Sequence, residues 1–277
     1  MKTIVPIADR SIACEISGEG PPVLFVHAYP LDRSVWANQL PIDGYRSIAV
    51  DLPGFGESGD LAAGDAFEMS RYAESLVQVL DRLGVADPIV YVGVSMAGYI
   101  GWELFRTIPG RVRAAVLCCT KAAADTPEFA AKRLSVAEKV LREGSDAVTA
   151  TARTLLGETS RERRPELEST LRALIRGTSP RAIAAAQRGM AVRRDQRDLL
   201  PTITMPVQLI AGEEDGFSPP EEMKSWATFL PNVHFAVIPE AGHLPMMEAP
   251  DQFRAVLMRF LREIDQSPAN RRGGENR

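Results

Sequence analysis

Short apolar runs alternate with amphipathic stretches along most of this chain, and this alternation narrows the possible folds more than any other feature. Nearly continuous apolar runs are typical of parallel strands that helices cover on both faces. Such an order of strands and helices predicts a doubly wound α/β sheet. We expect strands at Val23–His27, Arg46–Leu52, Ile89–Val94, Ala114–Cys119, Val207–Ala211 and His234–Ile238, and helices at Met69–Leu83, Met96–Thr107, Pro219–Leu230 and Pro250–Ile264.

Two further segments near the N-terminus predict a pair of antiparallel strands. These segments are Lys2–Ile7 and Ser11–Ser17, and turn residues near Asp9 separate them. Together with the runs above, they predict an eight-stranded, mostly parallel sheet flanked by helices.

The composition excludes several classes of protein. The chain has 277 residues, of which 45% are hydrophobic and 25% charged, so it can bury a sizeable core and is not mainly disordered. A net charge of −4 provides no overall positive field to attract nucleic acid. No apolar run reaches the roughly 20 residues that a membrane-spanning helix needs. We therefore expect neither a nucleic-acid partner nor a membrane partner, and the oligomeric state stays open.

The first residues and the cysteines indicate a cytoplasmic protein. The opening MKTIVPIADR has one Lys, an early Asp and no long apolar stretch, unlike a secretory signal. Cys14, Cys118 and Cys119 fit free thiols in a reducing compartment better than a disulfide framework. No Cys/His pattern has metal-ligand spacing, and no glycine-rich loop fits a dinucleotide. We therefore expect no metal and no cofactor.

Residues 120–206 interrupt the alternation with what we interpret as an all-helical insertion. Ser or Thr at a helix start caps free N–H groups, and Gly at a helix end provides the left-handed conformation. The stretch contains no convincing strand, but four segments carry such signals: Thr126-Pro127 to Gly144, Ser145 to Gly157, Pro165 to Gly177, and the residues after Ser179-Pro180.

These boundaries divide the chain. We predict a core domain formed by residues 1–119 and 207–265, with a helical cap at 120–206 that covers a pocket. A polar stretch, 266–277, follows and is expected to be disordered. The cap is basic within an acidic protein, because residues 121–206 contain 16 Lys+Arg and 11 Asp+Glu.

The sharpest chemical signal is a serine between a strand and a helix. An apolar strand ends at Val94, Ser95 follows, and small residues flank it at Gly93, Ala97 and Gly98. A serine on such a sharp turn exposes its hydroxyl above the sheet, and the backbones come too close for large neighbours. The next N–H, that of Met96, points to where an oxyanion would form. An incidental serine in a glycine-rich turn is the alternative.

The serine turn, taken together with four other segments of the sequence, makes the chain resemble the α/β-hydrolase superfamily. Within it, the chain is most similar to bacterial esterases, enol-lactonases and cofactor-free haloperoxidases. The resemblance covers residues 3 to 264. It rests on the serine turn and on four further segments: His27-Ala28-Tyr29-Pro30, Asp51 to Ser58 (DLPGFGES), Gly212-Glu213-Glu214-Asp215 and Ala241-Gly242-His243. Trp36 follows the first of these segments, as in the family.

The resemblance implies a catalytic triad of Ser95, Asp215 and His243, in the chain order that this fold uses. Histidine suits the general base near neutral pH, and a buried carboxylate fixes its tautomer. Asp215 competes with Glu213 and Glu214, since three acids in a row are also typical of a solvated loop. An acid after Cys119 is another known arrangement, for which Asp125 is the nearest candidate and fits poorly.

The resemblance also implies an oxyanion hole formed by the N–H groups of Tyr29 and Met96. The family commonly has Gly where this chain has Ala28 and Ala97. Strain of about 1 kcal/mol or more would follow if Ala28 needed a positive φ.

We expect an apolar pocket above Ser95. His27 ends a strand beside it, and in the family this histidine is usually structural. We predict that apolar side chains of the core and of the cap line this pocket. The core residues are Tyr29, Trp36, Met96, Phe217, Leu244 and Met246. The cap residues are Phe129, Leu134, Val136, Leu155, Leu156, Leu174, Ile183 and Met190.

These residues predict a cofactor-independent serine hydrolase that acts on a small or medium carboxylic ester or lactone through an acyl-enzyme. Perhydrolysis of the haloperoxidase type and carbon–carbon bond hydrolysis would use the same triad. A ligand-binding receptor that uses the pocket belongs to another class, and an intact triad argues against it. The basic cap raises the option of an anionic substrate, although neighbouring glutamates indicate solvated helix faces instead.

Overall fold

A computed structural model describes residues 1–8, 10–61 and 66–266. Its strands form one eight-stranded sheet in the order β1-β2-β4-β3-β5-β6-β7-β8, in which β2 pairs antiparallel with β1 and β4 and the other neighbours are parallel. The predicted eight-stranded, mostly parallel sheet is therefore confirmed. The strands are β1 Lys2–Ile7, β2 Arg10–Ser17, β3 Pro22–Val26, β4 Arg46–Val50, β5 Ile89–Val94, β6 Val112–Cys118, β7 Val207–Gly212 and β8 Val233–Ile238.

Helices cover both faces of the sheet, which explains why its central strands are apolar throughout. Apolar side chains of β3–β7 point alternately into two buried layers, one for each face. One layer packs on α1 (Met69–Arg82), α2 (Met96–Thr107) and α8 (Pro220–Ala227). The other packs on the 3-10 helix η1 (Arg33–Gln39), α9 (Pro245–Glu248) and α10 (Pro250–Gln266).

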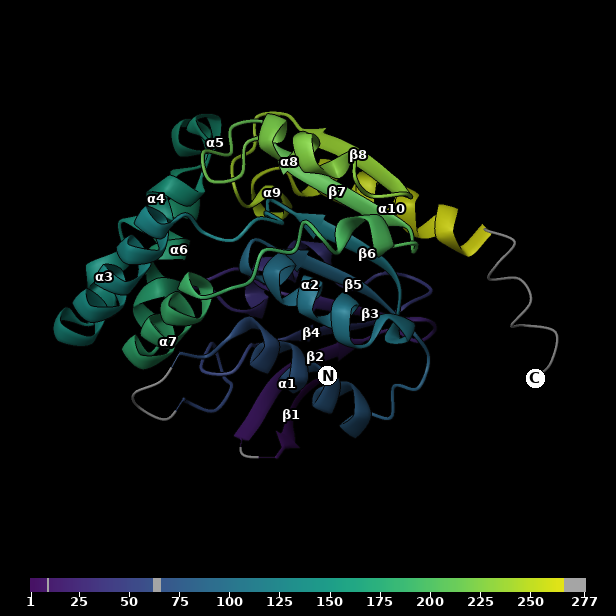
Figure 1. The fold of residues 1–277 in the computed structure, drawn as a ribbon, viewed down its shortest axis with the longest axis horizontal. Coiled ribbons are helices and arrows are strands. Elements are labelled where there is room, and N and C mark those ends of the chain that lie inside the picture. The colour runs from purple at the N-terminus through teal and green to yellow at the C-terminus, as the bar shows by residue number, and fades with distance from the viewer. Residues whose placement is uncertain (9, 62–65, 267–277) are drawn as a thin grey trace.

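A helical insert lies between β6 and β7, and Figure 1 shows it gathered at one end of the sheet. None of its described residues forms a strand, as predicted. The insert contains the short 3-10 turns η3 Ser145–Val148 and η4 Leu200–Thr202, whereas η2 (Pro109–Arg111) precedes β6. The insert's α-helices are α3 Pro127–Glu143, α4 Thr151–Leu155, α5 Glu158–Arg163, α6 Pro165–Gly177 and α7 Pro180–Ala191.

Three of the four helix segments predicted in the insert match α3, α6 and α7. The Thr126 side chain accepts a hydrogen bond from the N–H of Phe129, and Gly144 ends α3 with φ 81°. The single helix predicted from Ser145 to Gly157 is wrong, because the chain there forms η3 and α4, and α5 follows directly.

The glycines after the second and third segments do not act as left-handed helix stops. Gly157 has φ −63° and precedes α5. A Cβ on Gly157 would lie 2.4 Å from Glu214 Oε2 and 2.9 Å from the Gly242 nitrogen, so this glycine allows two backbones to approach. Gly177 is the last residue of α6, and extended Thr178 follows it.

Two remaining predictions concern the end of the chain and membranes. Gln266 belongs to α10 rather than to a tail, and residues 267–277 lie outside the described part of the chain, so disorder there stays a prediction. Within the described ranges, no helix is long and apolar enough to cross a bilayer.

Candidate active site

Ser95 occupies a sharp turn between β5 and α2. Its backbone has φ 57° and ψ −114°, a sparsely populated conformation that costs a non-glycine residue about 1–3 kcal/mol. Neighbouring groups hold it there: the Ser95 N–H donates to the Cys118 carbonyl (2.9 Å), and the Ser95 carbonyl accepts from the Gly98 N–H and the Thr120 hydroxyl (2.8 Å each). Strain that is held by so many contacts is typical of a functional position.

The small residues around Ser95 are required by space. A Cβ on Gly98 would lie 2.2 Å from Thr120 Oγ1, and a Cβ on Gly93 would lie 2.8 Å from the Tyr91 ring and 3.0 Å from the Ala97 Cβ. Ala28 has no positive φ, so the strain considered for it does not arise.

Asp215 and His243 meet through a short hydrogen bond. His243 Nδ1 lies 2.8 Å from Asp215 Oδ2, and the two side chains are 5% and 0% exposed. The other Asp215 oxygen accepts from the N–H groups of Phe217 (2.8 Å) and Ser218 (3.2 Å). Burial alone would raise the pKa of Asp215, but His243 and these N–H groups outweigh it and lower the pKa. Asp215 is therefore held ionised, with His243 Nδ1–H as its donor.

Glu213 and Glu214, the competing acids, have other partners. Glu214 accepts from the Thr159 N–H (2.9 Å) and from the Thr159 hydroxyl (2.5 Å), which lie in the insert. Glu213 Oε2 accepts from the Glu240 N–H at 3.0 Å. Asp125, the alternative after β6, forms ion pairs with Arg133 and Arg193.

A buried carboxylate that the sequence reasoning missed organises the His243 loop. Glu248 accepts hydrogen bonds from the N–H groups of Gly242 (3.0 Å), Leu244 (2.9 Å) and, from the insert, Gly157 (2.8 Å). The His243 N–H itself donates to the Leu155 carbonyl of α4 at 2.9 Å. The insert therefore helps to hold the histidine loop. The sequence does contain a sign of this role, because Glu248 is the one acid in the otherwise apolar segment LPMMEAP.

Cys119 lies close to the acid and the histidine. Its Sγ, a carboxylate oxygen of Asp215 and a ring nitrogen of His243 lie within 4.8 Å of one another, a grouping that could hold a metal ion and that sequence spacing did not indicate. Burial raises the pKa of the Cys119 thiol well above its usual range, so it is protonated. A protonated thiol is a poor metal ligand, and Asp215 and His243 already bind each other.

The two amides expected to form an oxyanion hole follow β3 and β5, which are neighbouring parallel strands. Met96 is the first residue of α2, and its N–H is one of the helix's unpaired donors. Tyr29 lies in the loop after β3, where the Leu31 N–H donates to the Ala28 carbonyl (2.9 Å) and the Thr178 hydroxyl to the Pro30 carbonyl (3.1 Å). Neither amide donates to another described residue, so both are available to a ligand.

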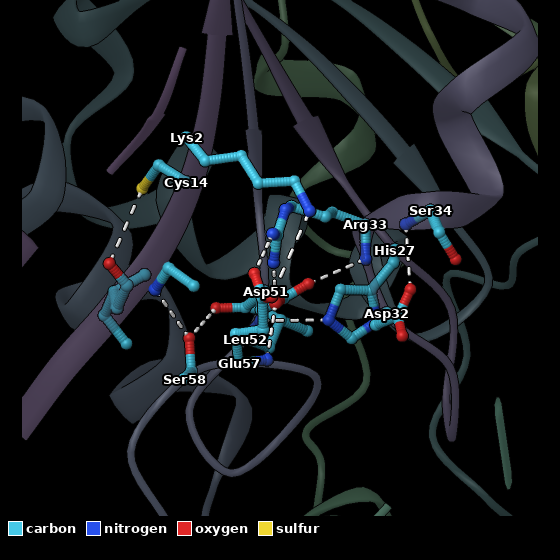
Figure 2. Close-up of polar contacts among 12 residues, drawn as sticks. Lys2, Cys14, His27, Asp32, Arg33, Ser34, Asp51, Leu52, Glu57 and Ser58 are labelled. Atoms are coloured by element: carbon cyan, nitrogen blue, oxygen red, sulfur yellow. Dashed lines mark hydrogen bonds and ion pairs between the residues drawn. The ribbon is translucent and has the colours of Figure 1, made fainter. Parts of the chain in front are cut away.

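His27 hydrogen-bonds to the backbone at the end of β3 and at Leu52, and Figure 2 shows it among the residues around Asp51. Its Nε2 accepts from the Leu52 N–H at 2.9 Å, so the proton is on Nδ1, which faces the Ala28 carbonyl at 2.9 Å. Burial lowers the pKa of His27, which keeps the ring neutral. His27 therefore has the structural role that the resemblance implies for it.

Asp51 extends the same support. Its carboxylate accepts from the N–H groups of Arg33 and Glu57 (2.8 Å each) and forms a buried ion pair with the Arg33 guanidinium, which also pairs with the Glu57 side chain (Figure 2). Gly56 has φ 54°, and a Cβ there would lie 2.2 Å from Asp51 Oδ2. The DLPGFGES segment thus braces the loop that carries Tyr29.

The predicted pocket residues lie in different surroundings. Phe217 is 38% exposed, and its ring lies 5.1 Å from the His243 ring. Trp36 is fully buried between the rings of Phe25 (5.4 Å) and Phe253 (5.9 Å). Leu244 and Met246 are fully buried as well. That these residues line a substrate pocket stays a prediction.

The predicted cap lining is similarly divided. Phe129 and Leu134 are 42% and 46% exposed, on α3. Four other predicted positions are buried: Leu155, Leu156, Ile183 and Met190. A cavity of about 470 Å³ lies beside the Asp51 network, and the predicted cap position Leu174 lines it together with Arg33, Glu57 and Thr178.

Fold and site together define a known class of protein. The profile of the alpha/beta hydrolase fold family matches residues 21–250, so this chain belongs to that family. The resemblance inferred from the motifs is therefore confirmed.

Individual relatives are similar over nearly the whole chain. A pimeloyl-[acyl-carrier protein] methyl ester esterase from Aliivibrio salmonicida is 27% identical over 272 residues, which cover 92% of this chain and 98% of that protein. A thermophilic esterase from Thermogutta terrifontis is 37% identical with a TM-score of 0.91, covering 95% of this chain and 99% of that one. An enol-lactonase from Burkholderia xenovorans (22%, TM-score 0.84, covering 94% and 100%) shares the fold.

Proposed function

We propose that this protein is a serine hydrolase that cleaves a carboxylic ester through an acyl-enzyme intermediate. The observation that carries the proposal is the 2.8 Å bond between the buried Asp215 carboxylate and His243 Nδ1. This bond leaves Nε2 as the basic nitrogen of the imidazole, which is the arrangement a general base needs. Ser95, on its strained turn, is the matching nucleophile.

The reaction follows from these roles. The Ser95 oxygen attacks the ester carbonyl carbon while His243 Nε2 takes the hydroxyl proton. The carbonyl oxygen becomes an oxyanion, which the N–H groups of Tyr29 and Met96 stabilise. His243 then returns the proton to the leaving alcohol, and an ester of Ser95 remains. Water, deprotonated by His243, releases the acid and restores the serine.

The relatives support an ester in preference to other substrates. Both the Aliivibrio protein and the 37% identical Thermogutta protein are named as esterases. A lactone is a cyclic ester and would react by the same steps, but the enol-lactonase, at 22% identity, is evidence for the fold alone. We therefore propose a small or medium ester as the substrate class, with lactones as the second class to test.

Replacement of the nucleophile tests the proposal. Ser95→Ala should reduce kcat for 4-nitrophenyl butyrate by about 10⁴-fold or more and leave the melting temperature close to that of the wild type. Ser225→Ala, which removes an exposed hydroxyl on α8, is the control and should keep full activity. Undiminished turnover by Ser95→Ala would refute the proposal. A panel of γ- and δ-lactones assayed with both variants then separates the two substrate classes.

A further inference from the structure

Two arginines of the insert are largely shielded from solvent and share one carboxylate. Arg133 on α3 and Arg193 after α7 are 14% and 5% exposed, and both pair with the 5% exposed Asp125, at 2.5 and 2.6 Å. Arg133 also donates to the Gln187 side chain at 3.2 Å. Helices α3 and α7 lie side by side over the end of the sheet (Figure 1). We call Asp125, Arg133, Gln187 and Arg193 the Arg133 cluster.

The Arg133 cluster has an excess of positive charge. Its two guanidinium groups share one carboxylate, and in the part of the chain that the structure describes neither forms an ion pair with a second acid. Gln187 is neutral. A buried charge without a full counter-charge is costly, so such a cluster favours binding of an anion. Arginine's planar fork also matches the geometry of a carboxylate.

Two tyrosine hydroxyls near the cluster are buried. The Tyr72 hydroxyl meets no other described residue in hydrogen-bond geometry. The Tyr29 hydroxyl has Gln187 and Arg133 beside it, and both oppose the rise in its pKa that burial causes. Tyr72 lies close enough for Tyr29 to affect its pKa. Buried polar groups are normally satisfied, so the unpartnered Tyr72 hydroxyl indicates a place for a bound polar group.

The location links these groups to the reacting centre. Tyr29 provides a proposed oxyanion N–H from its backbone, while its side chain reaches the Arg133 cluster. Tyr99, one helical turn after Ser95 on α2, lies under the Arg193 guanidinium at 4.2 Å. A molecule with its carbonyl carbon at Ser95 would therefore have the cluster within reach of its other end.

We propose that the Arg133 cluster, with the Tyr29 and Tyr72 hydroxyls, binds a carboxylate of the substrate. The inference rests on the proposed ester hydrolysis and narrows it to esters that carry a second, ionised carboxyl group. The inference does not depend on the overall excess of Lys and Arg in the insert. Exposed arginines there, such as Arg172 and Arg176, have acidic partners of their own.

The test compares matched charged and neutral substrates. Mono-4-nitrophenyl glutarate carries the carboxylate on the acyl side, and its methyl ester is the neutral control. 3-Carboxyphenyl acetate and its methyl ester place the charge on the alcohol side. The wild type should prefer the charged member of one pair by tenfold or more in kcat/KM, chiefly through KM.

Three variants locate that preference. Arg133→Gln and Tyr72→Phe should each reduce the charged-to-neutral ratio by at least fivefold. Arg142→Gln is the matched control, since Arg142 is 67% exposed on the same helix, and should keep the ratio. Tyr72→Phe removes only an unpartnered hydroxyl, so it remains informative if Arg133→Gln fails to fold. Equal rates on both pairs, or an unchanged ratio in the variants that fold, would overturn the inference.

A binding measurement separates this inference from the proposed reaction. Monomethyl glutarate is titrated into Ser95→Ala, which cannot form an acyl-enzyme. Binding that Tyr72→Phe or Arg133→Gln weakens by fivefold or more supports the carboxylate site even if no ester is cleaved. 3-Carboxyphenyl acetate is titrated in the same way, because it carries the carboxylate on the alcohol side. If neutral esters are cleaved by Ser95 but neither compound binds more tightly than its neutral methyl ester, the inference fails and the proposed function stands.

Discussion

The carboxyl end of the sheet and the helical insert reach the same site but are built differently. Ser95, Asp215 and His243 follow β5, β7 and β8, so a continuous ladder of strands sets their spacing. The insert reaches this group of residues directly through the Leu155 carbonyl, which accepts from the His243 N–H. Its Gly157 N–H and Thr159 hydroxyl bond to the neighbouring carboxylates of Glu248 and Glu214. Its helices α4 and α5 have only five and six residues. Such short helices depend on tertiary contacts for stability.

This contrast indicates a division of roles between the two regions. A sheet holds reacting groups at separations that change little, as bond-making chemistry requires. The insert also bonds to the core elsewhere, for example from the Thr178 hydroxyl to the Pro30 carbonyl and from Arg164 to the Met247 carbonyl. Because no residue of the proposed triad lies in it, its sequence can vary without changing the reacting groups, which suits selection of substrates. The Arg133 cluster belongs to the insert, whereas both proposed oxyanion donors belong to the core.

The largest effect should come from the sheet side. Asp215→Asn keeps the shape of the acid but no longer accepts the His243 Nδ1 proton as a carboxylate, so kcat for a neutral ester should fall by about 10⁴-fold. Glu214→Gln, one residue away, loses the Thr159 contact only and should retain activity within tenfold. Steady-state kinetics on both variants gives the comparison. If Asp215→Asn and Glu214→Gln lost the same fraction of kcat, Asp215 would have no special role in catalysis.

An intermediate effect should appear where the two regions join. Glu248→Gln weakens three buried hydrogen bonds, to Gly157, Gly242 and Leu244. Loss of such charge-assisted bonds should lower the free energy of unfolding by about 1–3 kcal/mol. Urea unfolding measures it, with Glu263→Gln, on the exposed surface of α10, as the control. Wild-type stability in Glu248→Gln would show that the insert and the histidine loop are joined by other contacts.

The smallest effect is a pH dependence of stability that belongs to the sheet side. The pKa of Asp215 is lower in the folded protein than its ordinary value, so its carboxylate stabilises the fold above about pH 4. That contribution is lost as the pH falls through the folded-state pKa. The wild type should therefore lose more stability than Asp215→Asn between pH 5 and pH 3, with a slope difference of up to about 1.4 kcal/mol per pH unit. Parallel pH profiles of the two proteins would contradict this.

Much of the core could be predicted because its signals are local. A buried parallel strand is apolar along its length, and a serine turn needs small neighbours, so β3–β8 and the Ser95 turn follow from the residues themselves. The insert was less predictable. The glycine at 157 resembles a helix stop, but its backbone lies against Gly242, some 85 residues further along the chain.

The site shows the same limit. Glu213, Glu214 and Asp215 are equivalent as a run of letters, and only the fold directs Asp215 to His243 and the two glutamates to Thr159 and Glu240. Glu248, Arg33 and Asp51 were missed as supporting residues because each acts on groups that are distant in sequence.

The sequence by itself determined the alternation of strands and helices, the helical insert and the identity of the candidate nucleophile, since these depend on local periodicity and turn geometry. The tertiary structure alone decided which acid meets the histidine, how the insert holds the histidine loop, and that Arg133 and Arg193 share the Asp125 carboxylate. The physical reason is that hydrogen bonds and desolvation act between neighbours in space, whatever their separation along the chain.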